Sequence, residues 1–186
     1  KMKKSIFQEI EIPDGVEINI KGDEVIVKGK EGENKRKFKL GKIKLEKKEN
    51  KILIGYKNST KKEKKMINTT TAHIKNMIHG SQEKFVYELK ICFSHFPITV
   101  KIEERNAIIK NFLGEKIDRK TKIPVGVEVK VDKETLYVSS TDKEKAGEAA
   151  ANLEKITQIK NRDRRVFQDG IFITNKSRRE IWDNEN

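Results

Sequence analysis

The sequence contains a single cysteine, Cys92, among 186 residues. One cysteine excludes an intrachain disulfide, and such a low content is typical of proteins that work in a reducing compartment. Aromatic residues make up only 6% of the chain and hydrophobic residues only 34%. An apolar content this low disfavours one thick core, and it favours two small α+β units that each have a thin core.

Long hydrophobic runs and targeting signals are also missing. The opening stretch KMKKSIFQEIEI is basic, but no apolar segment follows it, so we expect no secretory leader. No other stretch approaches the length of a membrane span. The sequence therefore predicts a cytosolic protein with no membrane partner.

The motifs that bind nucleotide cofactors or metals are absent. No two glycines lie two positions apart, which excludes GxGxxG, and neither Gly-Lys pair precedes Ser or Thr, which excludes a P-loop. His73 and His79 lie six apart on a predicted helix and so face different ways. Cys92 and His95 lie three apart on a predicted strand, so they point to opposite faces and cannot pair as nucleophile and base. We expect no enzyme, cofactor, metal site or small-molecule substrate.

Positive charge is abundant and unevenly divided. The chain has 42 Lys and Arg against 29 Asp and Glu, a net charge of +13, which favours a polyanionic partner such as nucleic acid. A lysine-rich proteome is the alternative explanation. Residues 1–80 hold 21 basic and 11 acidic residues, whereas residues 81–186 hold 21 and 18. Arg36 is the only arginine of the first part, and the second part has Arg105, Arg119, Arg162, Arg164, Arg165, Arg178 and Arg179.

One block of sequence occurs twice. IPDGVEINIKGDEVIV at Ile12–Val27 aligns without a gap with IPVGVEVKVDKETLYV at Ile123–Val138, at an offset of 111 residues. Apolar residues alternate with polar ones on both sides of a turn in each copy, which predicts a strand–turn–strand module. Two copies of such a module indicate that one small domain was duplicated.

A helix is predicted after each copy. Thr60 and Glu63 form a capping box, and Gly80 fits the end of the first helix; Thr141 and Glu144 form the corresponding box in the second copy. Further strands are predicted at Lys35–Leu40, Ile43–Leu45, Ile52–Tyr56, Phe85–Phe93, Ile98–Glu103, Ala107–Asn111 and Gly170–Thr174.

The predicted fold class is α+β. It is a tandem duplication of one small domain, and each copy is an antiparallel or mixed sheet packed against one main helix. The predicted domains are 1–82 and 83–175, with a basic tail at 176–186.

Four basic clusters stand out along the chain: Lys61–Lys65, Lys116–Lys122, Lys160–Arg165 and Lys176–Arg179. The first opens a helix, where cations oppose the helix dipole, so it serves either a partner or simply the solvent. The last lies in the tail, where a solvated charge run is the stronger interpretation.

The second and third clusters each fill a loop that leads into a strand of the second domain, so we expect them to converge on one rim. Phe112 and Phe167 lie beside them, and aromatic rings among arginines can stack on bases, although core packing is the more common role. Asp163 and Asp169 lie next to arginines and are predicted to orient guanidinium groups.

Several stretches resemble one known family. They are SHFPITV, NFLGEK, AHIKNMIHG, KNRDRRVFQDGIFI and the segment around Asp142–Glu154. Together they are similar to the universal ribosomal protein number six of the large subunit, called number nine in eukaryotes. The archaeal and eukaryotic branch is the more similar one, and the KMKKSI start and the insertion before AHIKNMI favour a divergent eukaryote.

The resemblance implies a non-catalytic constituent of the cytosolic ribosome, which would pass through the nucleolus if the source is eukaryotic. It implies that the second domain binds ribosomal RNA near the sarcin–ricin loop and the elongation-factor site, beside other ribosomal proteins. The contact candidates, with Arg119 and Lys120 added from the second basic cluster, are Asn111, Gly114, Glu115, Lys116, Arg119, Lys120, Lys160, Arg162, Asp163, Arg164, Arg165, Asp169 and Gly170. The alternatives are a basic module for another RNA and an enzyme that acts on a polyanion.

Overall fold

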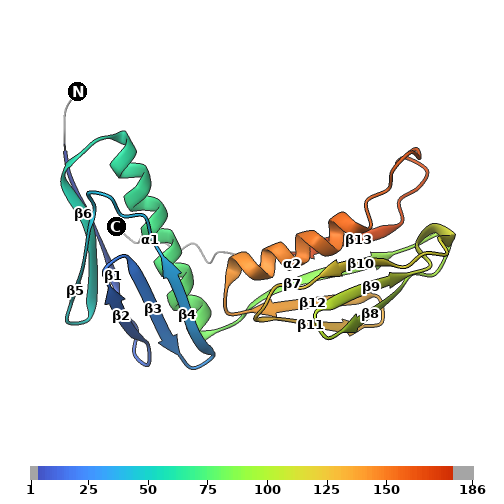
Figure 1. Cartoon of the computed structure of the whole chain (residues 1–186), viewed down its shortest axis with the longest axis horizontal. Coiled ribbons are helices and arrows are strands. Elements are labelled where there is room, and N and C mark those ends of the chain that lie inside the picture. The colour runs from blue at the N-terminus through green and yellow to red at the C-terminus, as the bar shows by residue number, and fades with distance from the viewer. Residues whose placement is uncertain (1–3, 178–186) are drawn as a thin grey trace. The chain divides into compact units, whose positions relative to one another are not determined.

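The computed structural model describes residues 4–177, and every structural statement below concerns that range. Most of the predicted tail, from residue 178 onward, lies outside the described residues. The chain divides into two compact units. The first unit comprises the residues up to Lys84 together with Thr141–Lys143, and the second comprises Phe85–Ser140 and the residues from Glu144 onward. Figure 1 labels the helices and strands of both units.

The first unit contains two three-stranded antiparallel sheets. One has the strand order β1-β6-β5 and the other β2-β3-β4. The strands are β1 (Lys4–Glu11), β2 (Glu17–Lys21), β3 (Glu24–Gly29), β4 (Gly32–Lys37), β5 (Lys44–Lys48) and β6 (Lys51–Ser59). Helix α1 (Lys61–Gln82) contacts β1, β3, β4 and β6, so it packs on both sheets.

Helix α1 begins as the sequence predicts. The Thr60 backbone N–H donates to the Glu63 carboxylate at 2.9 Å, and the Thr60 side chain accepts from the Lys62 N–H, so the capping box is formed. The predicted end at Gly80 is wrong, because the helix continues to Gln82 and ends where the Glu83 N–H donates to the His79 carbonyl. Gly80 is a buried position within the last turn.

The second unit also contains two antiparallel sheets, with orders β10-β9-β8 and β11-β12-β7-β13. Its strands are β7 (Phe85–Cys92), β8 (Thr99–Glu103), β9 (Asn106–Lys110), β10 (Arg119–Lys122), β11 (Val127–Asp132), β12 (Thr135–Ser140) and β13 (Gly170–Asn175). A 3₁₀ turn, η1 (Phe112–Gly114), follows β9, and helix α2 (Lys143–Ile156) follows β12.

Helix α2 buries its alanine face. One core cluster contains Leu89 of β7, buried residues of the β10-β9-β8 sheet, and four residues of α2: Ala146, Ala149, Ala150 and Leu153. Small side chains let the helix approach the sheet closely, which suits a thin core. The helix begins at Lys143, two residues after Thr141, and the capping box of Thr141 and Glu144 stays a prediction.

The duplicated hairpins adopt the same register. Ile18 pairs with Val27 in the first unit, and Val129 pairs with Val138 in the second, at the offset of 111 that the sequence shows. The two-copy α+β fold predicted from the sequence is therefore confirmed.

Two strands were not predicted. Strand β1 lies in the basic opening stretch. The segment Arg119–Lys122, predicted as loop, is β10 at the edge of its sheet and pairs with β9.

Candidate nucleic-acid interface

The turn after β9 is compact and shaped by unusual backbone angles. Asn111 adopts a left-handed conformation with a φ of 58°, and its Nδ2 donates to the Pro97 carbonyl at 3.1 Å. Gly114 has a φ of +76°, and a Cβ there would lie 3.3 Å from the Phe96 ring, so a side chain would be strained and crowded. Phe112 is buried beneath the turn. The backbone before the exposed Lys116 is therefore held in a defined conformation.

Arg119 joins this turn to the end of α2. Its Nε and Nη2 donate to the two Glu115 carboxylate oxygens at 2.8 and 2.6 Å, and its Nη1 donates to the Ile156 carbonyl at 2.7 Å. The guanidinium also lies 4.2 Å from the centre of the Phe112 ring. Arg119 lowers the pKa of Glu115 below its ordinary value, and Arg162 adds to that effect through its charge. The second and third basic clusters therefore lie close together near Glu115, as predicted.

The arginine loop, residues 157–169, connects α2 to β13 and extends beyond the end of the helix (Figure 1). Asp163 Oδ1 accepts from the Arg165 backbone N–H at 2.9 Å, and Oδ2 accepts from Arg165 Nη2 at 2.9 Å. Arg165 holds the pKa of Asp163 below its ordinary value. The guanidinium of Arg162 lies 4.8 Å from the centre of the Phe167 ring. The predicted orienting role of Asp163 is therefore confirmed.

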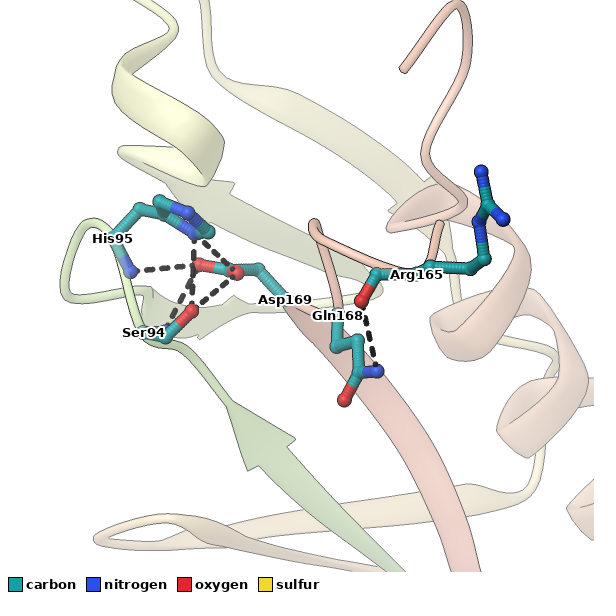
Figure 2. A network of polar contacts seen from close by, with 5 residues as sticks. All are labelled: Ser94, His95, Arg165, Gln168 and Asp169. Atoms are coloured by element: carbon teal, nitrogen blue, oxygen red, sulfur yellow. Dashed lines mark hydrogen bonds and ion pairs between the residues drawn. The ribbon is translucent and has the colours of Figure 1, made fainter. Parts of the chain in front are cut away.

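Asp169 does not orient an arginine, so that prediction is wrong. Its carboxylate is almost completely buried and accepts from the backbone N–H groups of Ser94 and His95 at 3.1 and 3.2 Å. The Ser94 hydroxyl donates to it at 3.1 Å, and His95 Nδ1 lies 2.8 Å away. Figure 2 shows these contacts converging on one carboxylate, and we call Ser94, His95 and Asp169 the carboxylate clasp.

The carboxylate clasp also orders the arginine loop. The His95 ring stacks on Phe167 with centres 4.7 Å apart and planes 23° apart, and Phe167 in turn lies against Arg162. Burial of Asp169 opposes its ionisation, but the hydrogen bonds from His95 and Ser94 outweigh that effect and lower its pKa. The ionised carboxylate therefore fixes the segment before β8 to the end of the loop.

The clasp contains Ser, His and Asp, yet its geometry does not support nucleophilic catalysis. Ser94 Oγ and Asp169 Oδ1 both lie at the same ring nitrogen, Nδ1 of His95. A catalytic triad needs the serine at one imidazole nitrogen and the carboxylate at the other. Across residues 4–177, no cluster of His, Cys, Asp and Glu could hold a metal ion, and no helix is long and apolar enough to span a membrane.

The candidate residues fall into four structural groups. Those exposed without an ion pair among the described residues are Lys116, Lys120, Lys160 and Arg164. Those whose charged groups already bind other protein groups are Glu115, Arg119, Asp163 and Arg165. Asp169 and Gly170 are buried and offer no surface to a partner. The remaining members, Asn111, Gly114 and Arg162, shape or flank the exposed surface.

Ser94 and His95 are site residues that the sequence did not predict. They lie 75 and 74 residues from Asp169 in the sequence, so no local pattern connects them. The available signal was the SHFPITV motif, which contains both residues.

The chain folds as a duplicated α+β domain whose second copy carries an exposed basic loop surface. The family of ribosomal protein L6 matches the sequence at residues 12–84 and 96–170, once in each half. The chain belongs to the ribosomal protein L6 family. It is a structural ribosomal protein and not an enzyme, as the sequence predicts.

Three archaeal relatives cover nearly the whole chain, and each is called large ribosomal subunit protein uL6. The Methanobrevibacter smithii protein is 45% identical over 172 residues, which is 92% of this chain and 97% of the relative. The Methanosarcina mazei protein is 41% identical, covering 95% of this chain and 100% of its own length. The Methanococcus vannielii protein is 42% identical, covering 92% and 94%. These relatives support the archaeal and eukaryotic branch but give no support to a eukaryotic source.

Proposed function

We propose that the chain is a constituent of the large subunit of the cytosolic ribosome and that its second unit holds ribosomal RNA. The observation that carries this proposal is the convergence of two basic segments on one braced surface. Arg119 links the turn at Asn111–Lys116 to the end of α2, and the clasp fixes the end of the arginine loop. A surface that is ordered before binding loses less conformational entropy when RNA binds.

The individual charges suit phosphate contact. Lys116, Lys120, Lys160 and Arg164 are exposed and have no acidic partner among residues 4–177. Arg165 is held by Asp163, yet its side chain remains 90% exposed. Arginine can bind phosphate through two parallel hydrogen bonds, whereas lysine acts as a point charge. We therefore propose that arginines fix the position of the RNA and that lysines add attraction.

The RNA site that the family resemblance implies is the region of the sarcin–ricin loop and the elongation-factor site, beside neighbouring ribosomal proteins. Directed hydroxyl-radical cleavage tests this. An iron chelate on a cysteine introduced at Lys116, in a Cys92→Ala background, should cleave RNA in that region. A chelate at Lys48, on β5 of the first unit, serves as the matched control. Cleavage from Lys116 only at distant sites would refute this location.

Binding to the large subunit is tested separately by sedimentation. A stable ribosomal constituent should remain with large subunits at high salt, where a transient RNA binder or a polyanion-directed enzyme dissociates. Log affinity for the RNA should fall linearly with log salt, with a slope of about −0.9 per phosphate contact on a duplex. A flat salt response would exclude phosphate contacts as the main source of affinity.

A further inference from the structure

A cleft of about 980 Å³ lies in the second unit, beside the surface described above. It lies among the end of α2, the start of β13 and the arginine loop. Phe93, Phe167 and Phe172 contribute its aromatic lining, and Lys155, Arg164 and Gln168 contribute polar groups. The volume is within the range of small-molecule sites, about 300–1,000 Å³.

Two phenylalanine rings and one valine of the cleft lining are exposed. Phe93 is 40% exposed and Phe172 is 43% exposed, although aromatic residues make up only 6% of the chain. Val166, which also lines the cleft, is 62% exposed. Apolar side chains that gather at one concave surface mark an interaction site more often than isolated ones do.

The free edge of β13 argues against an added peptide strand as the occupant. Strand β13 ends its sheet, so its outward backbone groups would be available to a peptide. However, the Ile171 N–H already donates to Thr157 Oγ1 at 2.9 Å, and the Ile173 N–H donates to Glu154 Oε1 at 3.5 Å. Side chains from α2 and the residue after it therefore occupy the donors that strand addition needs.

The charges at the cleft favour an anionic occupant. Lys155 and Arg164 are exposed and have no carboxylate partner within the described part of the chain. The two acids that line the cleft are both engaged, Asp169 by the clasp and Glu154 by the Ile173 N–H. The hydrogen bond from a neutral N–H does not cancel the charge of Glu154, but neither Lys155 nor Arg164 is held by a carboxylate, so both cations can contact a phosphate group.

We propose that this cleft receives one unpaired nucleotide of the ribosomal RNA. The base would stack on Phe172 or Phe93, and its phosphate would meet Arg164 and Lys155. Gln168 donates through Nε2 to the Arg165 carbonyl at 3.4 Å, which leaves its Oε1 available to accept from a base edge (Figure 2). This inference rests on the proposed RNA-binding function and adds a site that reads a single base.

Affinity of the full chain for its large-subunit RNA tests the proposal. Phe172→Ala should weaken binding about tenfold, because the variant lacks a ring on which the base can stack. Phe172→Trp, which keeps a stacking surface, should bind like the unmodified protein. Val86→Ala, at a 43% exposed position on β7 outside the cleft, is the matched control and should have no effect. Equal effects of Phe172→Ala and Val86→Ala would refute the cleft, provided that circular dichroism shows both variants folded.

A photo-crosslink identifies the occupant. Benzoylphenylalanine at position 172 should crosslink to one nucleotide in the assembled subunit, and the same group at position 86 should not. A crosslink from position 172 to a protein, or no crosslink to RNA, would overturn the proposal.

The RNA-binding proposal and the cleft proposal predict different failures. If Arg164→Ala weakens RNA binding and Phe172→Ala does not, only the cleft is refuted; if the unmodified chain does not bind the RNA, both are refuted.

Discussion

The start of α1 and the arginine loop are both densely basic, but only the loop holds its charged side chains against neighbouring protein groups. At the start of α1, Lys61, Lys62, Lys64 and Lys65 are exposed, and the only acid among them, Glu63, is engaged by Thr60 in the capping box. Hydrogen bonds from Thr60 lower the pKa of Glu63, which stays ionised for the cap. In the loop, by contrast, Arg165 is held by Asp163, and Arg162 lies against Phe167. Similar densities of basic residues therefore give unrestrained positive charges at the start of α1 and positive charges at fixed positions in the arginine loop.

The largest expected effect comes from the arginine loop. Changing Arg164 and Arg165 together to Ala should weaken RNA binding about 30- to 1,000-fold, because the variant lacks two guanidinium groups that can donate charge-assisted hydrogen bonds to phosphate. Changing both to Lys should restore only part of the affinity, because lysine cannot bind phosphate bidentately. Binding measured across a range of salt concentrations checks both variants. If the Lys variant binds like the unmodified protein, the geometry of the guanidinium is unimportant.

The second effect concerns the clasp that supports the loop. Asp169→Ala should lower the free energy of unfolding by about 1–3 kcal/mol at neutral pH, because the part-buried donors of Ser94 and His95 lose the charged acceptor that they share. Asp163→Ala, at an exposed ion pair, is the control and should change stability little. Urea denaturation gives both values. A similar loss for the two variants would show that the clasp is no more important than a surface pair.

The pH dependence of this clasp has a definite sign. The pKa of Asp169 is lower in the folded protein, so the clasp stabilises the fold above the unfolded pKa of an aspartate. That stabilisation is lost as the pH falls through the lower, folded value. The stability difference between the unmodified protein and Asp169→Asn should therefore shrink on acidification, and a difference that grows would contradict the assignment.

A smaller effect is expected at the cap of α1. Thr60→Ala should destabilise the protein by about 1 kcal/mol, because it removes the side chain that accepts from the Lys62 N–H. RNA affinity should not change if the second unit carries the specific contacts. Thermal denaturation and RNA binding on the same sample check the two parts. A marked loss of affinity would show that the start of α1 has a defined position on the RNA.

The smallest effect is expected for the lysines themselves. Changing Lys64 and Lys65 to Ala should weaken RNA binding by less than about threefold at moderate salt, and should lower the salt slope by about one for each phosphate that the variant no longer neutralises. Comparison with the arginine double variant at equal charge change is the sharpest test of the division between the two regions. A larger loss of affinity for the lysine variant than for the arginine variant would show that the lysines of α1, and not the arginine loop, fix the position of the RNA.

The features that depend on neighbouring residues could be predicted from sequence. Thr60 and Glu63 of the capping box lie three positions apart, and Asp163 and Arg165 lie two apart, so local spacing is sufficient to predict both contacts. The repeat was also predictable, because the two hairpins keep one alternation and one offset.

The features that were predicted wrongly or not at all depend on contacts between residues far apart in the sequence. Asp169 lies beside arginines in the sequence, but its partners come from the segment before β8. Strand β10 has the sequence RKTK, which contains no apolar alternation, and it becomes a strand only because β9 offers it backbone partners. Charged side chains on such an edge are common, since they discourage pairing with other molecules.

The turns before the two repeated hairpins also matter for protein engineering. Gly15 and Gly126 have φ angles of +82° and +84°, and nothing lies within 4 Å of the place where a Cβ would sit in either of them. The glycine is therefore required by the backbone conformation alone and not by packing. The same backbone conformation therefore occurs in two different contexts. Replacing each glycine with the same residue would impose the same local strain in both units, so the two losses of stability would compare how well each unit tolerates it.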